Sequence, residues 1–202
     1  MTPAEPGAPT AEVRARPLRA DARRNRERVL EAAELALATE GVSVRIDEVA
    51  RRAGVGVGTV YRQFPTKEAL FEAILLRRLE RLVEEARSRA GAADPGEAFF
   101  GFLEHLVEVG TQKRDLADAL SRAGIDVDAA ASPAGQQLAG AVEELLLRAQ
   151  RSGAVRADVG MPELFGLVAG TCLAADRRLP GACSPQRMLG IVCDGLRPPV
   201  GG

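Results

Sequence analysis

The polar residues whose types suit recognition of another molecule lie between positions 45 and 67 of the chain. An arginine can bond both acceptors on the major-groove edge of guanine, and a glutamine matches adenine in the same way. Lysine, threonine and tyrosine side chains suit phosphate oxygens. The set comprises Arg45, Thr59, Tyr61, Arg62, Gln63 and Lys67. Together, these side chains could bond the base edges and phosphates of a DNA duplex.

The segment that carries most of these residues has the spacing of a helix-turn-helix. Residues 46–64 read IDEVARRAGVGVGTVYRQF. Ala50 is small enough for a second helix to cross close to it, and Gly54, four residues later, suits the positive φ of a tight turn. Val60 would then fill the angle between the two helices. An ordinary helical hairpin can have the same spacing, so this pattern alone leaves both interpretations open.

The residues around this turn resemble a known family. Three groups carry the resemblance, namely Ala53-Gly54-Val55, Gly58-Thr59-Val60-Tyr61-Arg62-Gln63-Phe64 and Lys67-Glu68-Ala69-Leu70. They are similar to the fingerprint of the TetR/AcrR (tetracycline-repressor-like) family, over about residues 21–75. The resemblance implies an all-α fold, in which an N-terminal three-helix helix-turn-helix domain precedes a helical C-terminal bundle for ligand binding and dimerisation.

The short helix expected at 57–63 would enter the major groove with its first residues facing the bases. Val57 could touch a thymine methyl group, Gly58 would let the backbone approach closely, and Arg62 and Gln63 would read bases. Lys67, at the start of the next helix, would hold a phosphate together with the free N–H groups there. The predicted DNA-binding set is Arg45, Val57, Gly58, Thr59, Tyr61, Arg62, Gln63 and Lys67.

Two positions depart from the family pattern. Arg45 stands where the family commonly has Ser or Thr as a helix cap, and arginine cannot accept the N–H bonds, so Ser43 or water must compensate. Gln63 stands where the family often has His, so a relative's operator sequence does not transfer to this chain. Two alternatives also remain open. Tyr61 could pack in the core, and Arg51 and Arg52 are more simply read as solvated than as DNA-bound.

The charges are divided between two parts of the chain, although the net charge is only −1. Residues 14–67 contain twelve Lys and Arg against seven Asp and Glu, whereas residues 68–202 contain fifteen against nineteen. A basic part can bind phosphate, and an acidic part avoids DNA. An ordinary solvated surface would also fit these counts.

Apolar periodicity, with Gly and Pro between the periodic segments, predicts helices throughout. We expect a disordered arm over residues 1–20, the helix-turn-helix domain over 21–67, and the ligand-binding and dimerisation domain over 68–202. Gly41 should end the first helix, and Thr66, Ser132 and Ser184 should cap later ones. The expected helices cover residues 21–40, 45–53, 57–63, 67–89, 96–112, 113–123, 133–152, 161–178 and 185–196.

The composition argues against several classes of protein. The chain has one histidine, no glycine-rich phosphate loop and no metal-ligand spacing, so we expect no enzyme, cofactor or metal site. No apolar run approaches the roughly 18 residues of a membrane span, and residues 1–17 lack the apolar core of a secretory signal. Cys172, Cys183 and Cys193 are odd in number and form no CxxC pair. A cytoplasmic location fits these features.

The C-terminal part contains two candidate surfaces. Residues 163–175 and 188–196 are apolar nearly all round, and the resemblance implies that the last two helices pair with those of a second copy. A monomeric core would have the same composition. Residues 99–109 combine three Phe with the only histidine and could line an effector cavity, although plain core is the simpler reading. The predicted ligand set is Phe99, Phe102, Leu103, His105, Leu106 and Cys172.

These observations favour one functional hypothesis over two others. The favoured one is a homodimeric repressor that a small-molecule effector releases from a palindromic DNA operator. In the second, the three cysteines make the regulator respond to redox conditions. In the third, the chain is a small helical enzyme or binding protein with a vestigial helix-turn-helix. The intact set of Thr59, Tyr61 and Lys67 argues against the third.

Overall fold

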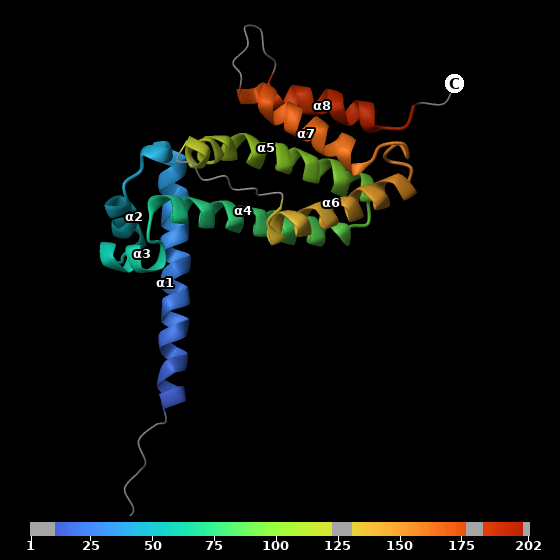
Figure 1. The fold of residues 1–202 in the computed structure, drawn as a ribbon. Coiled ribbons are helices and arrows are strands. Elements are labelled where there is room, and N and C mark those ends of the chain that lie inside the picture. Colours follow the sequence, from blue (N-terminus) through green and yellow to red (C-terminus); the bar gives the residue numbers. More distant parts are fainter. Residues whose placement is uncertain (1–10, 123–130, 177–183, 200–202) are drawn as a thin grey trace, which may run out of the picture. The chain divides into compact units, whose positions relative to one another are not determined.

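The computed structural model describes residues 11–122, 131–176 and 184–199. Within these ranges every regular element is a helix, which confirms the expected all-α class (Figure 1). The elements are α1 (Ala11–Glu40), the short 3-10 helix η1 (Gly41–Ser43), α2 (Ile46–Ala53), α3 (Val57–Gln63), α4 (Lys67–Ala90), α5 (Pro95–Arg122), α6 (Pro133–Arg151), α7 (Met161–Asp176) and α8 (Pro185–Leu196).

The chain divides into two compact units, an N-terminal unit that ends at Ile74 and a C-terminal unit that begins at Leu75. In the N-terminal unit, α1 packs against α2 and α3. Val29 of α1, Val49 of α2 and Val60 of α3 are completely buried between them. One valine from each helix thus meets in a small core, and Val60 has the plugging position that its spacing from Ala50 predicts.

The turn between α2 and α3 is left-handed. Gly54 has a φ of 65°, and its N–H points at the carbonyls of Ala50 and Arg51. The N–H of Val55 also donates to the Ala50 carbonyl, at 3.0 Å. The positive φ expected at Gly54 is therefore confirmed, and these bonds set where α3 begins.

Side-chain caps define the starts of three later helices, as expected. A serine or threonine oxygen accepts from the N–H three residues on, with Thr66 bonding Ala69 at 3.0 Å, Ser132 bonding Gly135 at 3.0 Å and Ser184 bonding Arg187 at 3.2 Å. At the N-cap of α2, Arg45 makes no such bond. Ser43 does not replace it, because its hydroxyl donates to the Glu40 carbonyl at 2.7 Å.

The first helix is longer than the sequence led us to expect. We expected a disordered arm over residues 1–20, but α1 begins at Ala11; residues 1–10 lie outside the described residues. The segment from 11 to 24 contains four Ala and five Arg, which favour helix. The division after Ile74 also falls later than the expected domain boundary at 67/68.

The two helices expected at 96–112 and 113–123 are a single helix, α5. Within this helix, Gly110 packs closely against α7. A Cβ added at Gly110 would lie 2.6 Å from the Cys172 Sγ and 3.9 Å from its Cβ. The missing side chain at position 110 therefore leaves the space that the cysteine sulfur occupies.

The C-terminal unit has one apolar core, to which α4, α5, α6, α7 and α8 all contribute. Phe99 and Phe102 are its largest fully buried side chains. The turn after α6 is held by Gln150, whose amide donates to the carbonyls of Arg156 and Val159 at 3.0 and 2.9 Å. Among the described residues, no helix combines the length and apolarity of a membrane span.

The contact between Gly110 and Cys172 predicts that a substitution at position 110 destabilises the protein and that a second substitution at position 172 relieves the effect. Gly110→Ala alone should lower the free energy of unfolding by about 1–3 kcal/mol, because the new methyl group overlaps the sulfur. In a Cys172→Ala background the same change should be neutral or stabilising, because alanine favours helix over glycine by about 1 kcal/mol. Urea unfolding of the four proteins of this cycle measures both effects. Equal penalties in the two backgrounds would contradict the packing described.

Candidate DNA interface

Helix α3 presents an open face to solvent. Val57 is 40% exposed and Tyr61 is 47% exposed, so Tyr61 is not a core residue. A Cβ built on Gly58 would meet nothing within 4 Å, which leaves the helix backbone accessible. Phe64, directly after α3, is buried as expected. The face that begins with Val57 and Gly58 can therefore approach another molecule closely.

The two residues expected to read bases have different surroundings. Arg62 is exposed, and its guanidinium lies along α3, where it donates to the Gly58 carbonyl and the Thr59 hydroxyl, both at 3.3 Å. Gln63 is half-buried, and its Oε1 is shielded from solvent without a hydrogen-bond partner. Position 63 lies three residues after the buried Val60 and so on the same side of the helix. In this conformation Gln63 does not present its oxygen to a base, which differs from the expectation.

The N-terminal unit has an open hollow of about 410 Å³ where η1, α2, α3 and the start of α4 meet. Its lining residues are Ser43, Val44, Arg45, Ile46, Asp47, Val57, Tyr61 and Lys67. Four of them belong to the set expected to bind DNA. The fold thus brings Arg45, Tyr61 and Lys67, which come from three parts of the sequence, to the rim of one concave surface.

Lys67 has an anchor that the sequence did not reveal. Its Nζ donates to the Val42 carbonyl at 2.7 Å and lies 5.3 Å from the centroid of the Phe71 ring. An ammonium group has three N–H donors, so this bond positions the charge and leaves donors for an anion. No sequence pattern marks this bond, because it joins a lysine to a main-chain oxygen 25 residues away.

Arg45 forms an ion pair with a carboxylate at the start of α2. Its Nε donates to the Asp47 Oδ1 at 3.0 Å, and both side chains are exposed. The hydrogen bond raises the pKa of Arg45 and lowers the pKa of Asp47. The carboxylate balances part of the charge that Arg45 would offer a phosphate.

Arg51 and Arg52 are occupied by carboxylates, in keeping with the solvated reading of the sequence. Arg52 bonds Glu40 at the end of α1 and Glu48 of α2, both at 2.6 Å. Arg51 bonds the same Glu48 at 2.7 Å. The two guanidinium groups, through their hydrogen bonds, lower the pKa of Glu48 to about 2. This cluster joins the last turn of α2 to the end of α1.

Most of the residues expected to bind an effector lie in or against the apolar core of the C-terminal unit. Phe99, Phe102 and Leu103 are completely buried in the apolar core. His105 is partly exposed, with its Nε2 3.1 Å from the Glu85 carboxylate. Leu106 packs against the core, and the Cys172 sulfur contacts the Val107 carbonyl at 3.9 Å. The contact to Glu85 gives His105 a structural partner in α4.

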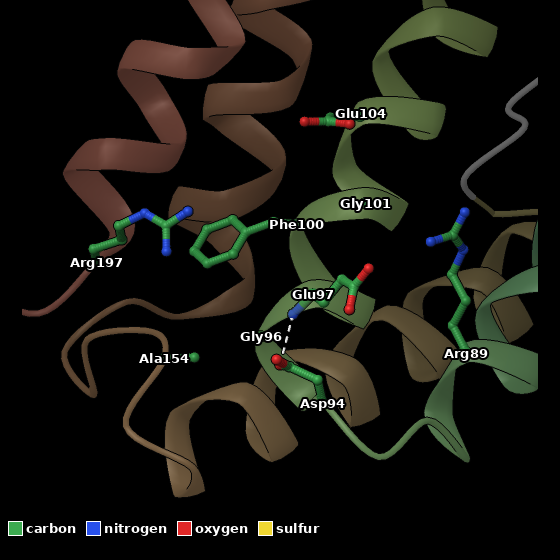
Figure 2. Close-up of a pocket in the computed structure, with 9 residues that line it drawn as sticks. All are labelled: Arg89, Asp94, Gly96, Glu97, Phe100, Gly101, Glu104, Ala154 and Arg197. Atoms are coloured by element: carbon green, nitrogen blue, oxygen red, sulfur yellow. Dashed lines mark hydrogen bonds between the residues drawn. The ribbon is translucent and has the colours of Figure 1, made fainter.

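An open hollow of about 580 Å³ does lie over the first turns of α5 (Figure 2). Its lining residues are Arg89, Asp94, Gly96, Glu97, Phe100, Gly101, Glu104, Ala154 and Arg197, none of which was expected from sequence. The Arg197 guanidinium stacks 4.4 Å from the Phe100 ring centroid, as Figure 2 shows. Acidic and basic groups are mixed around this hollow, so its charge selects no class of ligand.

The described cysteines are not arranged for metal binding or a disulfide. Cys172 and Cys193 are free thiols, and Cys183 lies outside the described residues. Burial raises the pKa of the Cys193 thiol and so disfavours its reactive thiolate. No group of three potential metal ligands occurs within the described ranges.

Helix α7 exposes large apolar side chains, as its composition indicates. Phe165, Leu167 and Leu173 are between 37% and 40% exposed. On α8, Ile191 is 63% exposed. Such a set on two successive helices is typical of a surface that another protein covers.

Comparison with known families agrees with this architecture. Residues 29–74 match the family described as "Bacterial regulatory proteins, tetR family", and residues 94–198 match "Transcriptional regulator SbtR-like, C-terminal domain" of the TetR group. The second match covers about half of the chain. This protein belongs to the TetR family.

Individual TetR-family members are similar over different lengths. The HTH-type transcriptional repressor KstR of Rhodococcus jostii is 34% identical over 126 residues, which are 61% of this chain and 58% of the relative. The match thus spans less than two thirds of that relative. A TetR regulatory protein of Mycobacterium vanbaalenii has a TM-score of 0.72 and 43% identity, covering 90% of this chain and 99% of that one. A TetR regulator of Streptomyces coelicolor has a TM-score of 0.70 and 32% identity, with 87% and 99% covered.

The cluster around Glu48 predicts a pH-dependent contribution to the stability of this TetR-family protein. The folded-state pKa of about 2 lies below the ordinary value of 4.5, so the contribution is complete above pH 4.5 and is lost as the pH falls towards 2. Glu48→Gln should lower the melting temperature at pH 7, and the gap from wild type should close between pH 4.5 and 2. Circular dichroism melts check this, with Glu72→Gln as an exposed control. A gap that is constant with pH would refute the assignment.

Proposed function

We propose that this protein is a homodimeric transcription repressor that binds a palindromic operator and releases it when a small-molecule effector binds. The observation that carries the proposal is the open face of α3, where Gly58 leaves the helix backbone accessible. A recognition helix needs such a face, because its first residues must reach the base edges in the major groove. The membership of the TetR family and the name of the KstR relative as a repressor support the same function.

The proposed DNA contacts follow from the geometry of the N-terminal unit. Val57, Gly58 and Arg62 lie on the exposed face of α3 and would meet bases. The side chains of Arg45, Thr59, Tyr61 and Lys67 would bind phosphates, three of them from the rim of the hollow of about 410 Å³. Gln63 would contribute only after its buried oxygen turns outward.

The exposed apolar face of α7 and α8 supports the proposed homodimer. Besides its large side chains, α7 carries Gly166 and Gly170, and a Cβ on either would meet nothing within 4 Å. Small residues beside exposed apolar ones allow a second helix to approach closely. Dimerisation would place two recognition helices on half-sites about 34–36 Å apart, one turn of DNA.

The effector would act by changing the distance between the two recognition helices of the dimer. A change of a few ångströms in the separation of the two recognition helices would break their simultaneous fit to the operator. We place the effector contacts on α5 and α7 of the C-terminal unit, at Phe99, Phe102, Leu103, His105, Leu106 and Cys172. Because operator DNA lies in the cytoplasm, the protein would act there. The redox alternative has less support, because the pKa of Cys193 is raised by burial.

Substitution on the open face tests DNA binding. Gly58→Ala should fold normally, since its methyl group enters open space, but should weaken operator binding about tenfold by blocking close approach to the bases. Arg62→Ala should weaken binding and relax the preference for one base. Fluorescence anisotropy with the chain's own upstream DNA measures both. The matched control is Gly140→Ala, an equally open helical glycine of α6. Wild-type affinity in Gly58→Ala would refute the proposed docking.

A charge on the exposed face of α7 tests dimerisation. Phe165→Glu should shift the protein from dimer to monomer in sedimentation velocity experiments and reduce operator binding, because one recognition helix alone holds only one half-site. Leu147→Glu on α6, where the leucine is 49% exposed, controls for the loss of an exposed apolar side chain. If Phe165→Glu remains a dimer, the proposed interface is wrong.

A further inference from the structure

Seven arginines lie between positions 14 and 28 of α1, and the helical periodicity divides these positions between two sides. They are Arg14, Arg16, Arg19, Arg23, Arg24, Arg26 and Arg28. At 3.6 residues per turn, positions 16, 19, 23 and 26 fall within about 80° of arc. Positions 14, 24 and 28 fall within a similar arc on a different side of the helix. We call the first group the arginine stripe.

The arginine stripe continues the side of α1 that packs in the core. Leu30, Ala33 and Leu37 are buried at alternating intervals of three and four residues. The same alternation, extended towards the N-terminus, reaches positions 26, 23, 19 and 16, and each of these is arginine. One side of α1 is therefore apolar where α2 and α3 cover it. Beyond them it is basic, and Figure 1 shows α1 running on past those two helices.

Arg26 fixes where the arginine stripe starts. Its guanidinium carbon lies 4.4 Å from the centroid of the Phe64 ring, and Phe64 directly follows α3. Stacking on the ring leaves the guanidinium N–H groups free to bond outward. The stripe thus begins at the C-terminal end of the recognition helix, next to the proposed DNA-binding face. Arg23, one turn earlier in α1, is exposed.

Two arginines outside the stripe bond neighbours on their own side of the helix. Arg24 forms an ion pair with Asp21, and Arg28 donates to the Asn25 side chain at 2.7 Å. On the striped side, the acidic positions Glu12 and Glu27 lie only beyond the two ends of the stripe. The positive charge is therefore concentrated along one line of the helix.

We propose that the arginine stripe binds phosphates of operator DNA outside the bases that α3 reads. From position 16 to position 26 the helix spans about 15 Å, which matches four to five base pairs of duplex. A line of like charges of that length, continuous with a DNA-binding face, fits a phosphate backbone and carries no base specificity. This inference rests on the proposed function.

Two triple variants that lose the same amount of positive charge distinguish binding by the stripe from a general effect of net charge on DNA affinity. The stripe variant is Arg16→Gln, Arg19→Gln and Arg23→Gln, and the control is Arg14→Gln, Arg24→Gln and Arg28→Gln. Each is titrated, as full-length protein, against a duplex that ends at the palindrome and a duplex with five additional base pairs on each side. Salt dependence is recorded for every pair, and circular dichroism confirms that helix content is unchanged.

The wild type and the control variant should bind the longer duplex about tenfold more tightly than the shorter one, and the stripe variant should bind both alike. In a plot of log affinity against log salt, the stripe variant on the longer duplex should have a less steep slope than the wild type. The difference should be roughly 0.9 for each phosphate that the stripe variant no longer neutralises. Equal weakening in the two variants, or no effect of duplex length on the wild type, would overturn the inference and leave the proposed function intact. A wild type that binds neither duplex would refute both.

Discussion

The left-handed turn at Gly54 is the constraint on which the recognition surface depends. A residue with a Cβ would be strained at its φ of 65° by roughly 1 kcal/mol or more. The turn sends the chain back so that the Val55 N–H reaches the Ala50 carbonyl, and Ala50 is small enough to allow it. Once that bond is made, the start of α3 is fixed, Val60 enters the core, and Val57 and Tyr61 are left outside.

Charged groups then hold α2 and α4 around that turn. Arg52 joins the end of α1 to α2 through Glu40 and Glu48, and Lys67 joins the start of α4 to the Val42 carbonyl. The Arg52–Glu40 ion pair and the Lys67–Val42 hydrogen bond both attach to the segment from 40 to 42, where α1 ends and η1 begins. The rim of the proposed phosphate-binding hollow is therefore positioned by polar contacts, whereas the axis of α3 is positioned by apolar ones.

The sequence predicted those features that depend on local spacing. The all-α fold, the Gly54 turn, the buried Val60 and the caps at Thr66, Ser132 and Ser184 all follow from residues a few positions apart. The features that it missed have a common cause. Residues 96–123 were expected as two helices because the packing of Gly110 on the distant Cys172 gives no local signal, and the burial of the Gln63 oxygen was not foreseen because it depends on how α3 packs. The anchor of Lys67 was missed because main-chain acceptors carry no sequence signal.

Helix α3 has only seven residues, includes a glycine, and has no side-chain cap at Gly56. An isolated helix of that length is not stable in water, because the cost of starting a helix exceeds the few hydrogen bonds that follow. Its order is therefore supplied by Val60 and the valines of α1 and α2. The shape of the proposed DNA-binding face therefore depends on three valines that are completely buried and that no DNA could touch, so a substitution in this small core would alter the face from behind.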